Sequence, residues 1–363
     1  MKIQNYTIDN ESPCFIIAEL SANHNGSLDV AIETIKAAKR AGADAIKLQT
    51  YTPDTMTIDH DNSHFQINEG TLWDGKTLFE LYGEAYTPWE WHETLFRVAE
   101  EEGLIYFSSP FDLTAVDFLE KFDVPAYKIA SFEIQDIPLI EYAASKMKPI
   151  IMSTGIANKD DIQLAVDTCR KVGNNEIILL KCTSSYPAPL KLANLNTIKD
   201  LKKYFDVEVG FSDHTYGVLA PVVATTLGAK LIEKHFILDK SIGGPDADFS
   251  LDENEFTKMV NAVRDTEKLV GIVSYEVTEK VKKNRKFARS LFVVEDVKKG
   301  DELTKNNVRS IRPGNGLHPK HYKKIMGKTF NKDVLRGEPL SHKMINYNYG
   351  SKRKKNISSS CTS

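Results

Sequence analysis

A repeated alternation of strand and helix patterns is the feature that most constrains the fold of this 363-residue chain. From residue 14 to about residue 270, short β-branched, apolar runs alternate with amphipathic stretches of helical period. The strand candidates span residues 14–20, 44–50, 104–110, 125–131, 149–155, 177–183, 207–213 and 230–236. Eight strands, each followed by a helix, predict the α/β class and a parallel (β/α)8 TIM barrel in preference to an open doubly wound sheet. Because a count of strands does not prove closure, the open sheet stays as the alternative.

Two of the intervening stretches show the helical pattern clearly. Residues 27–43 carry an apolar stripe that runs from Val30 to Ala41, and residues 158–173 end at Gly173, a residue typical of a helix C-terminus. The polar stretch from residue 51 to about 87 interrupts the alternation and contains one short helical segment, 77–86. A loop of this length in a compact domain is usually functional or disordered. In a barrel it would follow the second strand, on the active-site face.

The composition changes after the eighth unit. We expect a TIM-barrel domain over residues 1–275, a charged linker over 276–290 and a small β-rich domain over 291–350, in which "VKKGDEL" and "VLRGEPL" form two similar turns. The basic, Ser-rich segment 351–363 is expected to be a disordered tail.

Charge and cysteine content exclude several classes of protein. The 47 Lys and Arg residues against 50 Asp and Glu give a net charge of −3, so nucleic acid is not an expected partner. The N-terminus lacks the features of a signal peptide, and no apolar run approaches the ~20 residues of a membrane span. We therefore expect a cytoplasmic protein with no membrane partner. The four cysteines form no C-x-x-C pair or zinc spacing and are expected to be reduced and structural.

Polar side chains stand at the carboxyl ends of the predicted strands, which in a barrel meet at the active-site mouth. They are Glu19, Lys47, Gln49, Ser108, Ser109, Lys128, Ser131, Glu133, Ser153, Thr154, Lys181, Thr183, Ser212, Asp213, His214, Glu233 and His235. Each one alone could be a polar residue that forms hydrogen bonds at a strand end and has no further role. As a set, the inward lysines Lys47 and Lys128 with several hydroxyls predict an anion site for a phosphorylated or acidic substrate.

Two histidines stand at the ends of adjacent predicted strands. His214 and His235 are 21 residues apart, and both imidazoles could point into the mouth. With nearby carboxylates they suit a divalent transition metal that has open positions, such as Mn²⁺, with Zn²⁺, Fe²⁺ and Co²⁺ as competitors. A core or capping role is the alternative. In the turn over 243–252, Asp246 and Asp248 would sit above the mouth, where they either contact sugar hydroxyls or cap the last helix.

The chain resembles the sialic acid synthase family in eight motifs that follow one another from about residue 12 to 345. They are "FIIAELSANHNGSLDVAIETIKAAKRAGADAIKLQTYTPDTMT", "YFSSPFD", "AYKIASFE", "STGIA", "KCTSSYPAP", "VGFSDHTYG", "IEKHF" and "RPGNGLHP". The resemblance implies a barrel with a C-terminal antifreeze-like (SAF) domain, assembled as a domain-swapped homodimer. It also implies an enzyme that condenses phosphoenolpyruvate with an N-acetylated amino sugar. In that reaction C3 of the enol attacks the sugar aldehyde, water adds at C2, and phosphate leaves by C–O cleavage to give a nine-carbon 2-keto acid.

The resemblance also implies roles for individual residues. The phosphoenolpyruvate site would comprise Lys47, Ser109, Lys128, Ser131, Ser153 and Ser212. The sugar-facing group would comprise Gln49, Glu133, Tyr186, Glu233 and Asp246. His214 and His235 would bind the divalent metal, with Mn²⁺ preferred and Mg²⁺ or Co²⁺ as alternatives, and Glu19 would be the general acid or base. Arg312 in "RPGNG" would reach from the small domain into the partner subunit's barrel, where its planar fork suits an amide carbonyl.

Some positions depart from the N-acetylneuraminate branch of the family. Ser184 stands where Asn is frequent, and Ala247 stands where His is common. Residues 70–92 and 249–256 resemble a different branch of the family. With the two departures, this resemblance implies a di-N-acetylated 6-deoxy hexose, 2,4-diacetamido-2,4,6-trideoxy-L-altrose, as the acceptor in place of N-acetylmannosamine. Trp73 would contact this less polar sugar or pack its own loop.

Three rival functions remain from the sequence. An N-acetylneuraminate or legionaminate synthase would keep the chemistry and change the sugar. A 3-deoxy-sugar-phosphate synthase would need a second cluster of Arg and Lys for the phosphorylated acceptor, and the sequence offers none. A non-catalytic carbohydrate-binding protein would not require the intact set Glu19, Lys47, Lys128, His214 and His235.

Overall fold

The computed structural model describes residues 1–68, 70 and 73–347. The chain divides into two compact units, of which the first is Met1–Gly271 and the second begins at Ile272. The tail predicted over 351–363 lies outside the described residues.

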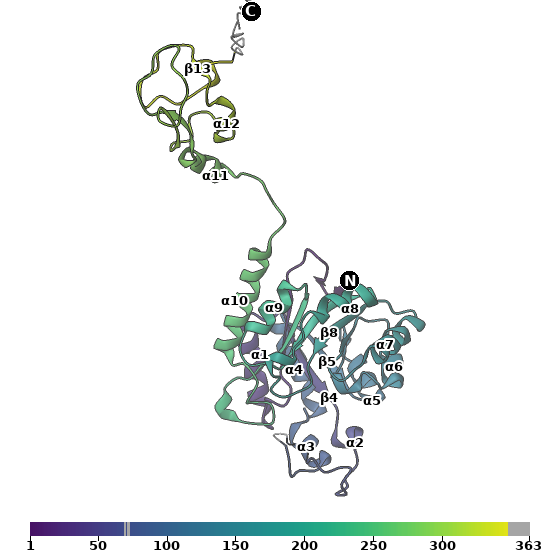
Figure 1. Cartoon of the computed structure of the whole chain (residues 1–363). Helices are drawn as coiled ribbons and strands as arrows, with labels where there is room; N and C mark the ends of the chain where they lie inside the picture. Colours follow the sequence, from purple (N-terminus) through teal and green to yellow (C-terminus); the bar gives the residue numbers. More distant parts are fainter. Residues whose placement is uncertain (69, 71–72, 348–363) are drawn as a thin grey trace, which may run out of the picture. The chain divides into compact units, whose positions relative to one another are not determined.

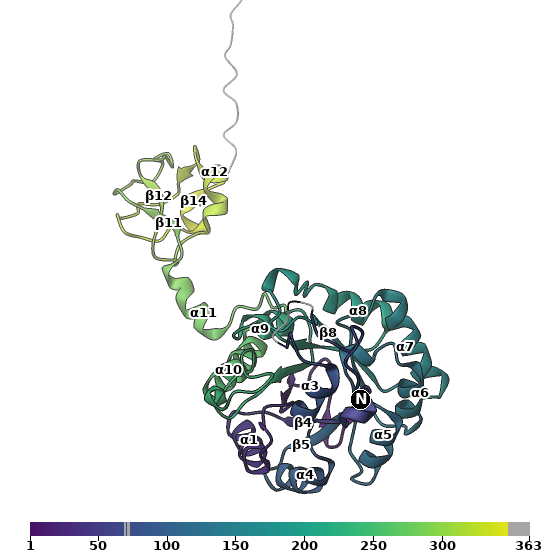
Figure 2. The ribbon, with the colours of Figure 1, turned by 90° about the horizontal axis from the view of Figure 1, so that it is seen from below.

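The first unit is a closed barrel of eight parallel strands (Figure 2). The strands are β3 (Phe15–Glu19), β4 (Ala45–Thr50), β5 (Ile105–Pro110), β6 (Tyr127–Ile129), β7 (Ile150–Ser153), β8 (Ile177–Cys182), β9 (Glu208–Asp213) and β10 (Leu231–His235). Each lies within one of the eight predicted ranges, and β10 pairs back onto β3. The predicted TIM barrel is confirmed, and the open sheet is excluded.

Helices surround the barrel on its outer side (Figure 2). They are α1 (Leu28–Arg40), α4 (His92–Glu101), α5 (Leu113–Glu120), α6 (Ile137–Ser145), α7 (Lys159–Lys171), α8 (Thr197–Phe205), α9 (Leu219–Thr226) and α10 (Glu253–Val270). Their starts follow local chemistry, since Ser27, Asp112, Asn158 and Asp252 each cap the following helix with a side-chain oxygen. Because helices cover the outer face and side chains fill the interior, the strands are apolar on both faces through their middle. Polar residues are therefore tolerated mainly at the strand ends.

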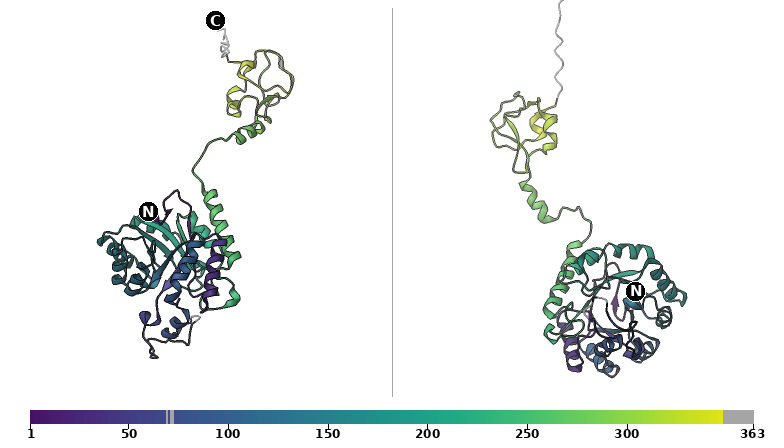
Figure 3. Two further views of the ribbon diagram at one scale, coloured as in Figure 1. Left: turned by 180° about the vertical axis from the view of Figure 1, so that it is seen from behind. Right: turned by 60° about the horizontal axis from the view of Figure 1, so that its bottom comes forward.

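The long insertion after β4 folds into two short helices. Helix α2 (Pro53–Met56) and helix α3 (Leu78–Ala85) lie beyond the end of the barrel that is opposite the N-terminus (Figures 1 and 3). Helix α3 is the helical segment predicted over 77–86, and it begins with a capping box between Thr77 and Glu80. The insertion thus stands at the carboxyl ends of the strands, as predicted.

The opposite end of the barrel carries the N-terminal hairpin of β1 (Lys2–Ile3) and β2 (Tyr6–Thr7). Ile3 and Ile8 are buried in the core cluster of the barrel. None of the helices in the described part of the chain combines the length and the apolar character needed to cross a membrane.

The second unit has a small apolar core of its own. Strand β11 (Ser290–Val293) pairs antiparallel with β12 (Val308–Ile311), and β13 (Thr329–Phe330) pairs with β14 (Ile345–Asn346). The two similar turns of the sequence lie side by side, because Val297 and Val334 form an antiparallel bridge. Helix α12 (Tyr322–Ile325) packs Ile325 into the core, and α11 (Glu279–Asn284) lies within the segment predicted as a linker.

Candidate active site

Two lysines and two glutamates form a buried cluster at the carboxyl ends of the strands. Lys47 Nζ lies 2.8 Å from Glu19 Oε2 and 3.7 Å from Glu233 Oε2, and Lys128 Nζ lies 3.5 Å from Glu233 Oε1. The barrel register explains the first contact, since Glu19 on β3 is the cross-strand partner of Lys47 on β4. The lysines predicted from the sequence are therefore not a bare cationic patch, because a carboxylate accompanies each of them.

Three of the predicted hydroxyls contact this cluster. Lys47 Nζ donates to Ser109 Oγ at 3.2 Å, Lys128 Nζ donates to Ser153 Oγ at 2.8 Å, and Ser212 Oγ donates to Glu233 Oε1 at 2.9 Å. Each serine ends a different strand. The structure thus brings lysine and hydroxyl donors from several strands to one place, as an anion site requires.

Ser131 belongs to a neighbouring group of small side chains. Ser184 Oγ donates to Ser131 Oγ at 2.7 Å. A Cβ atom at Gly155 would collide with both hydroxyls, so this close approach requires glycine at that position. Ser131 also lines the adjoining pocket, which places it between the charged cluster and that pocket.

The four charged groups have different protonation properties. Burial raises the pKa of Glu19, although the Lys47 ammonium opposes that rise. Burial alone would also raise the pKa of Glu233, but Lys128, Lys47 and Ser212 outweigh it and hold that pKa well below its usual range. Burial lowers the pKa of Lys128. The cluster thus pairs a carboxyl that retains its proton readily with one that stays ionised, an arrangement suited to proton transfer.

The two predicted metal ligands lie side by side. The imidazole rings of His214 and His235 are 5.4 Å apart between centroids. His214 Nδ1 lies 3.1 Å from the carbonyl oxygen of Thr183, which can only accept, so Nδ1 carries the proton and Nε2 keeps its lone pair. Burial lowers the pKa of His214 and keeps the ring neutral. A neutral imidazole with a free Nε2 is the form that binds a metal ion.

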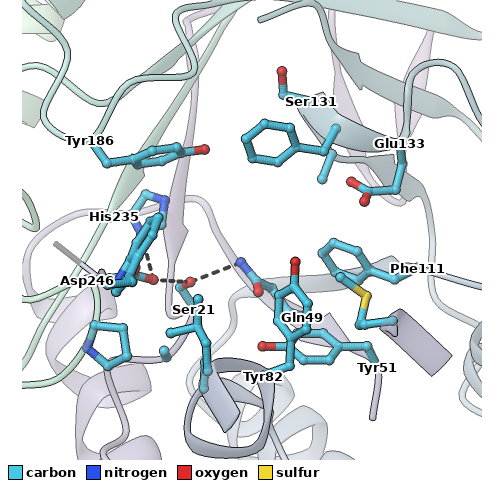
Figure 4. Close-up of a pocket in the computed structure, with 18 residues that line it drawn as sticks. Ser21, Gln49, Tyr51, Tyr82, Phe111, Ser131, Glu133, Tyr186, His235 and Asp246 are labelled. Atoms are coloured by element: carbon cyan, nitrogen blue, oxygen red, sulfur yellow. Dashed lines mark hydrogen bonds and ion pairs between the residues drawn. The ribbon is translucent and has the colours of Figure 1, made fainter. Parts of the chain in front are cut away.

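His235 ends a chain of polar contacts (Figure 4). Gln49 Nε2 donates to Ser21 Oγ at 2.9 Å, Ser21 Oγ donates to Asp246 Oδ2 at 2.5 Å, and that carboxylate lies 3.5 Å from His235 Nδ1. Buried His235 Nδ1 has no hydrogen-bond partner among the described residues. Gln49 also donates to Glu19 Oε1 at 2.8 Å, so the chain is joined to the charged cluster.

The donor set fits a divalent ion that is bound only in part by protein. His214 keeps a lone pair at Nε2, and His235 Nδ1, which makes no hydrogen bond among the described residues, lies 3.5 Å from the Asp246 carboxylate. In the described part of the chain no three His, Cys, Asp or Glu side chains are arranged as a complete metal site. Two histidines would leave the other positions to water or substrate, which is the arrangement of a catalytic metal site.

A pocket of about 230 Å³ adjoins His235 (Figure 4), whereas His214 does not line it. Its polar lining includes the predicted residues Gln49, Ser131, Glu133, Tyr186, His235 and Asp246. Its apolar lining includes Tyr51, Met56, Trp73, Leu81, Tyr82 and Phe111. Burial raises the pKa of Glu133 to about 7. The insertion after β4 supplies most of the apolar wall, so this loop shapes the pocket.

Several strand-end residues named from the sequence point elsewhere. Ser108 contacts Thr50, which contacts His92 on α4, so this group faces the helix layer. Lys181 Nζ donates to the backbone oxygen of Cys182. Neighbouring residues on a strand face opposite sides, which separates these side chains from the cluster.

Two further predictions have definite positions. Asp248 is exposed, accepts a hydrogen bond from Tyr216 and does not line the pocket, in contrast to Asp246. Arg312 is an exposed residue of the second unit.

Sequence reasoning missed part of the site. Ser21 links Gln49 to Asp246, and Phe249 packs its ring 4.9 Å from that of His235. Ser21 could have been found, because it directly follows the strand predicted over 14–20 and, two residues after Glu19, shares the inward phase of that residue. Phe249, Tyr82 and Phe111 gave no such signal, since an aromatic residue in a loop usually packs the loop itself.

The fold and the site define a class of protein. A closed (β/α)8 barrel that gathers buried lysines, hydroxyls, carboxylates and a histidine pair at its carboxyl end is the design of a TIM-barrel enzyme. The NeuB family model matches residues 34–275, and the SAF domain model matches residues 288–346. The chain therefore belongs to the NeuB family.

Individual relatives agree with this family. The chain is 51% identical over 340 residues to the pseudaminic acid synthase of Campylobacter jejuni, covering 94% of this chain and 98% of the relative. It is 50% identical to the pseudaminic acid synthase of Helicobacter pylori, covering 91% and 97%. It is 36% identical to the N,N'-diacetyllegionaminic acid synthase of Legionella pneumophila, covering 90% and 93%. The crystal structure of SpsE from Bacillus subtilis is similar with a TM-score of 0.65 and 34% identity, covering 96% and 99%.

Proposed function

We propose that this chain is a pseudaminic acid synthase. It condenses phosphoenolpyruvate with 2,4-diacetamido-2,4,6-trideoxy-L-altrose and water to give a nine-carbon 2-keto acid, pseudaminic acid, and inorganic phosphate. One observation carries the proposal: Gln49 connects a buried cluster of lysines and hydroxyls with an apolar-walled pocket of sugar size. The chain is about 50% identical in sequence to the named pseudaminic acid synthases over nearly its whole length. This similarity supports the choice of sugar.

Phosphoenolpyruvate would bind at the charged cluster. Lys47 and Lys128 would supply charge to the phosphate and carboxylate, and Ser109, Ser131, Ser153 and Ser212 would supply neutral donors. Both lysines already contact glutamates, so the substrate anion would take over contacts that Glu19 and Glu233 now make. Because Glu19 retains its proton readily, a protonated Glu19 would leave net positive charge for the incoming anion.

Glu19 is the proposed proton donor and acceptor. Attack of the enol C3 on the aldehyde carbon leaves an oxyanion that must gain a proton, and water must lose one when it adds at C2. Phosphate then leaves with the bridging oxygen by C–O cleavage, so the phosphorus keeps its oxygens. Glu19 contacts both Lys47 and Gln49, which places a carboxyl with a raised pKa between the two proposed substrate sites.

His214 and His235 would hold a divalent metal ion, with Mn²⁺ proposed and Mg²⁺ or Co²⁺ as alternatives. When bound, such an ion polarises a carbonyl oxygen and lowers the pKa of bound water. Asp246 would orient His235, and the pKa of Asp246 is low because His235 and Ser21 outweigh the effect of its burial.

The pocket wall favours a sugar with apolar substituents. A 6-deoxy hexose replaces a hydroxymethyl group with a methyl group, and each acetamido group adds another methyl. Tyr51, Met56, Tyr82 and Phe111 would contact these methyl groups, while Gln49, Glu133 and Tyr186 would bind polar atoms. With a pKa near 7, Glu133 can donate a hydrogen bond from its protonated form.

A domain-swapped homodimer is part of the proposal. Residues 276–363 contain 22 Lys and Arg against 8 Asp and Glu, whereas residues 1–275 contain 25 against 42. The near-neutral total thus conceals a basic C-terminal region and an acidic barrel. Opposite charges favour association of one chain's C-terminal region with another chain's barrel, where Arg312 would reach the sugar site.

A cytoplasmic location is proposed as well. Phosphoenolpyruvate is a metabolite of the cytoplasm, and Cys14, Cys169 and Cys182 are free buried thiols, as in a reducing compartment.

The proposal is tested by supplying phosphoenolpyruvate and Mn²⁺ with a panel of sugars and measuring phosphate release and product mass. The diacetamido-trideoxy altrose should give the highest kcat/KM. Preference for the legionaminate precursor or for N-acetylmannosamine would assign the chain to a rival branch. Absence of phosphate release with every sugar would defeat the enzymatic function.

A further inference from the structure

A buried ion pair joins the two strands that carry the histidines. Asp213 is the last residue of β9, and Lys234 precedes His235 at the end of β10. The two residues are cross-strand partners, and Lys234 Nζ lies 2.6 Å from Asp213 Oδ2. Both side chains are fully buried. Neither of them is available to solvent or to a substrate.

The pair faces away from the charged cluster. Successive side chains of a strand point to opposite faces, and Ser212 and Glu233 meet in the interior through a hydrogen bond. Asp213 and Lys234 must therefore lie on the outer face of the barrel, between the strands and the helices. The chemistry proposed for the site makes no use of these two charges.

Both members of the ion pair also contact the backbone of Thr215, the residue after His214. Asp213 Oδ1 accepts a hydrogen bond from the backbone N–H of Thr215 at 2.8 Å, and Lys234 Nζ donates to the backbone oxygen of Thr215. His214 lies between Asp213 and Thr215 in the chain, so its backbone is held on both sides. Because His235 follows Lys234 directly, the same contacts join the backbone on either side of His214 to the residue before His235.

We propose that Asp213 and Lys234 are positioning residues that hold His214 and His235 at the spacing needed to bind one divalent ion. The inference rests on the proposed metal role of the two histidines. A buried ion pair contributes little net stability compared with apolar residues of similar volume, because both charges lose their hydration. Its geometry is specific, however, and here it fixes the ends of two strands that must present nitrogen donors together.

The test is titration of the full-length, metal-free protein with Mn²⁺ alone, followed by electron paramagnetic resonance of the free ion. His235→Ala measures how much of the binding belongs to the histidine site. The double variant Asp213→Asn with Lys234→Met removes both charges without leaving one unpaired, and we expect Mn²⁺ affinity to fall by about tenfold or more. The control is Asp44→Asn with Arg264→Met, which removes a partly buried ion pair of 2.9 Å at the other end of the strands, together with the contact between Arg264 and Glu267.

The possible results distinguish the positioning role of Asp213 and Lys234 from the metal-binding role of the histidines. Weakened Mn²⁺ binding in the Asp213 and Lys234 variant, with unchanged binding in a control of similar thermal stability, supports positioning. Unchanged Mn²⁺ affinity in both variants would reduce the pair to a structural role and overturn the inference. Wild-type protein that binds no Mn²⁺, or binds it equally well after His235→Ala, would overturn the metal assignment itself.

If the double variant does not fold, Asp213→Glu tests the same idea. It keeps the charge and lengthens the acidic side chain by one methylene within a packed layer. We expect weaker Mn²⁺ binding in the folded variant, and unchanged affinity would overturn the inference.

Discussion

Glu19 Oε2 lies 2.8 Å from Lys47 Nζ, and both side chains are buried at the carboxyl ends of adjacent strands. The lysine lies between two carboxyls, since Glu233 Oε2 is 3.7 Å from the same nitrogen. One carboxyl has a raised pKa and the other a lowered pKa, although their positions in the barrel are similar. The difference arises because two lysines and Ser212 contact Glu233, whereas among the described residues Glu19 pairs with Lys47 alone.

The first prediction concerns this carboxyl. Glu19→Gln keeps the hydrogen-bonding shape and removes the proton that Glu19 transfers, so we expect kcat to fall by about 10²-fold or more with a small change in the phosphoenolpyruvate KM. The pH profile of kcat should also lose the limb on which activity falls as pH rises, because that limb reports loss of the Glu19 proton. Retention of wild-type kcat and pH profile would exclude Glu19 as the acid.

The second prediction concerns the anion site. Lys128→Met removes a buried charge that contacts Ser153 and Glu233, so we expect the KM for phosphoenolpyruvate to rise by about 10-fold to 100-fold. Lys181→Met is the control, because Lys181 lies near the end of β8, two strands away in the barrel, and donates to a backbone oxygen instead of the cluster. An equal rise in KM for both variants would show that the effect is not specific to the cluster.

The third prediction concerns sugar selection. Phe111→Ser replaces an aromatic side chain of the pocket wall with a small polar one. The kcat/KM for the diacetamido-trideoxy sugar should therefore fall by about 10-fold or more, while the phosphoenolpyruvate KM changes little. Leu113→Ser, at an exposed position two residues away, should leave both constants unchanged. A Phe111→Ser variant with wild-type sugar kinetics would remove this residue from the sugar site.

The fourth prediction concerns pH and stability. His92 is buried on α4, and burial lowers its pKa from 6.5 to about 4. Between these values the unfolded chain binds a proton that the folded protein does not bind, so the free energy of unfolding must fall as pH falls below 6.5. The loss due to His92 should reach about 2 kcal/mol by pH 5.

Chemical denaturation of wild type and His92→Gln at pH 7 and pH 5 measures this loss. The variant should lose less stability than wild type on acidification, because glutamine does not titrate. His60→Gln at an exposed position is the control. If wild type and His92→Gln lost the same free energy of unfolding between pH 7 and pH 5, the assignment of the loss to His92 would be wrong.

The fifth prediction concerns the second unit. Arg312→Ala should raise the sugar KM or lower kcat without unfolding the barrel, since the proposed role of Arg312 lies in the partner subunit's site. Added salt should weaken the dimer, because the basic C-terminal region and acidic barrel attract each other through screened charges. Unchanged kinetics would refute the role of Arg312, and a monomer at low salt would refute the dimer.

The barrel strands and the polar residues at their carboxyl ends could be predicted from the sequence alone. All eight strands were predictable because β-branched apolar runs have a short-range signature, and α1 and α7 were predictable from their apolar stripe and end signals. The rule that barrel enzymes work at the carboxyl ends of strands then selected Lys47, Lys128, His214 and His235 without any coordinates.

Closure of the barrel, the partners of the charges and the shape of the pocket depend on tertiary contacts that the sequence pattern does not contain. A strand pattern does not state its register, and register brings Glu19 beside Lys47 and Asp213 beside Lys234. Asp213 illustrates the limit: in the sequence it stands between Ser212 and His214 and could have either a catalytic or a structural role. Strand alternation turns it to the outer face, where a lysine 21 residues away meets it, and no local pattern records a contact between two distant segments.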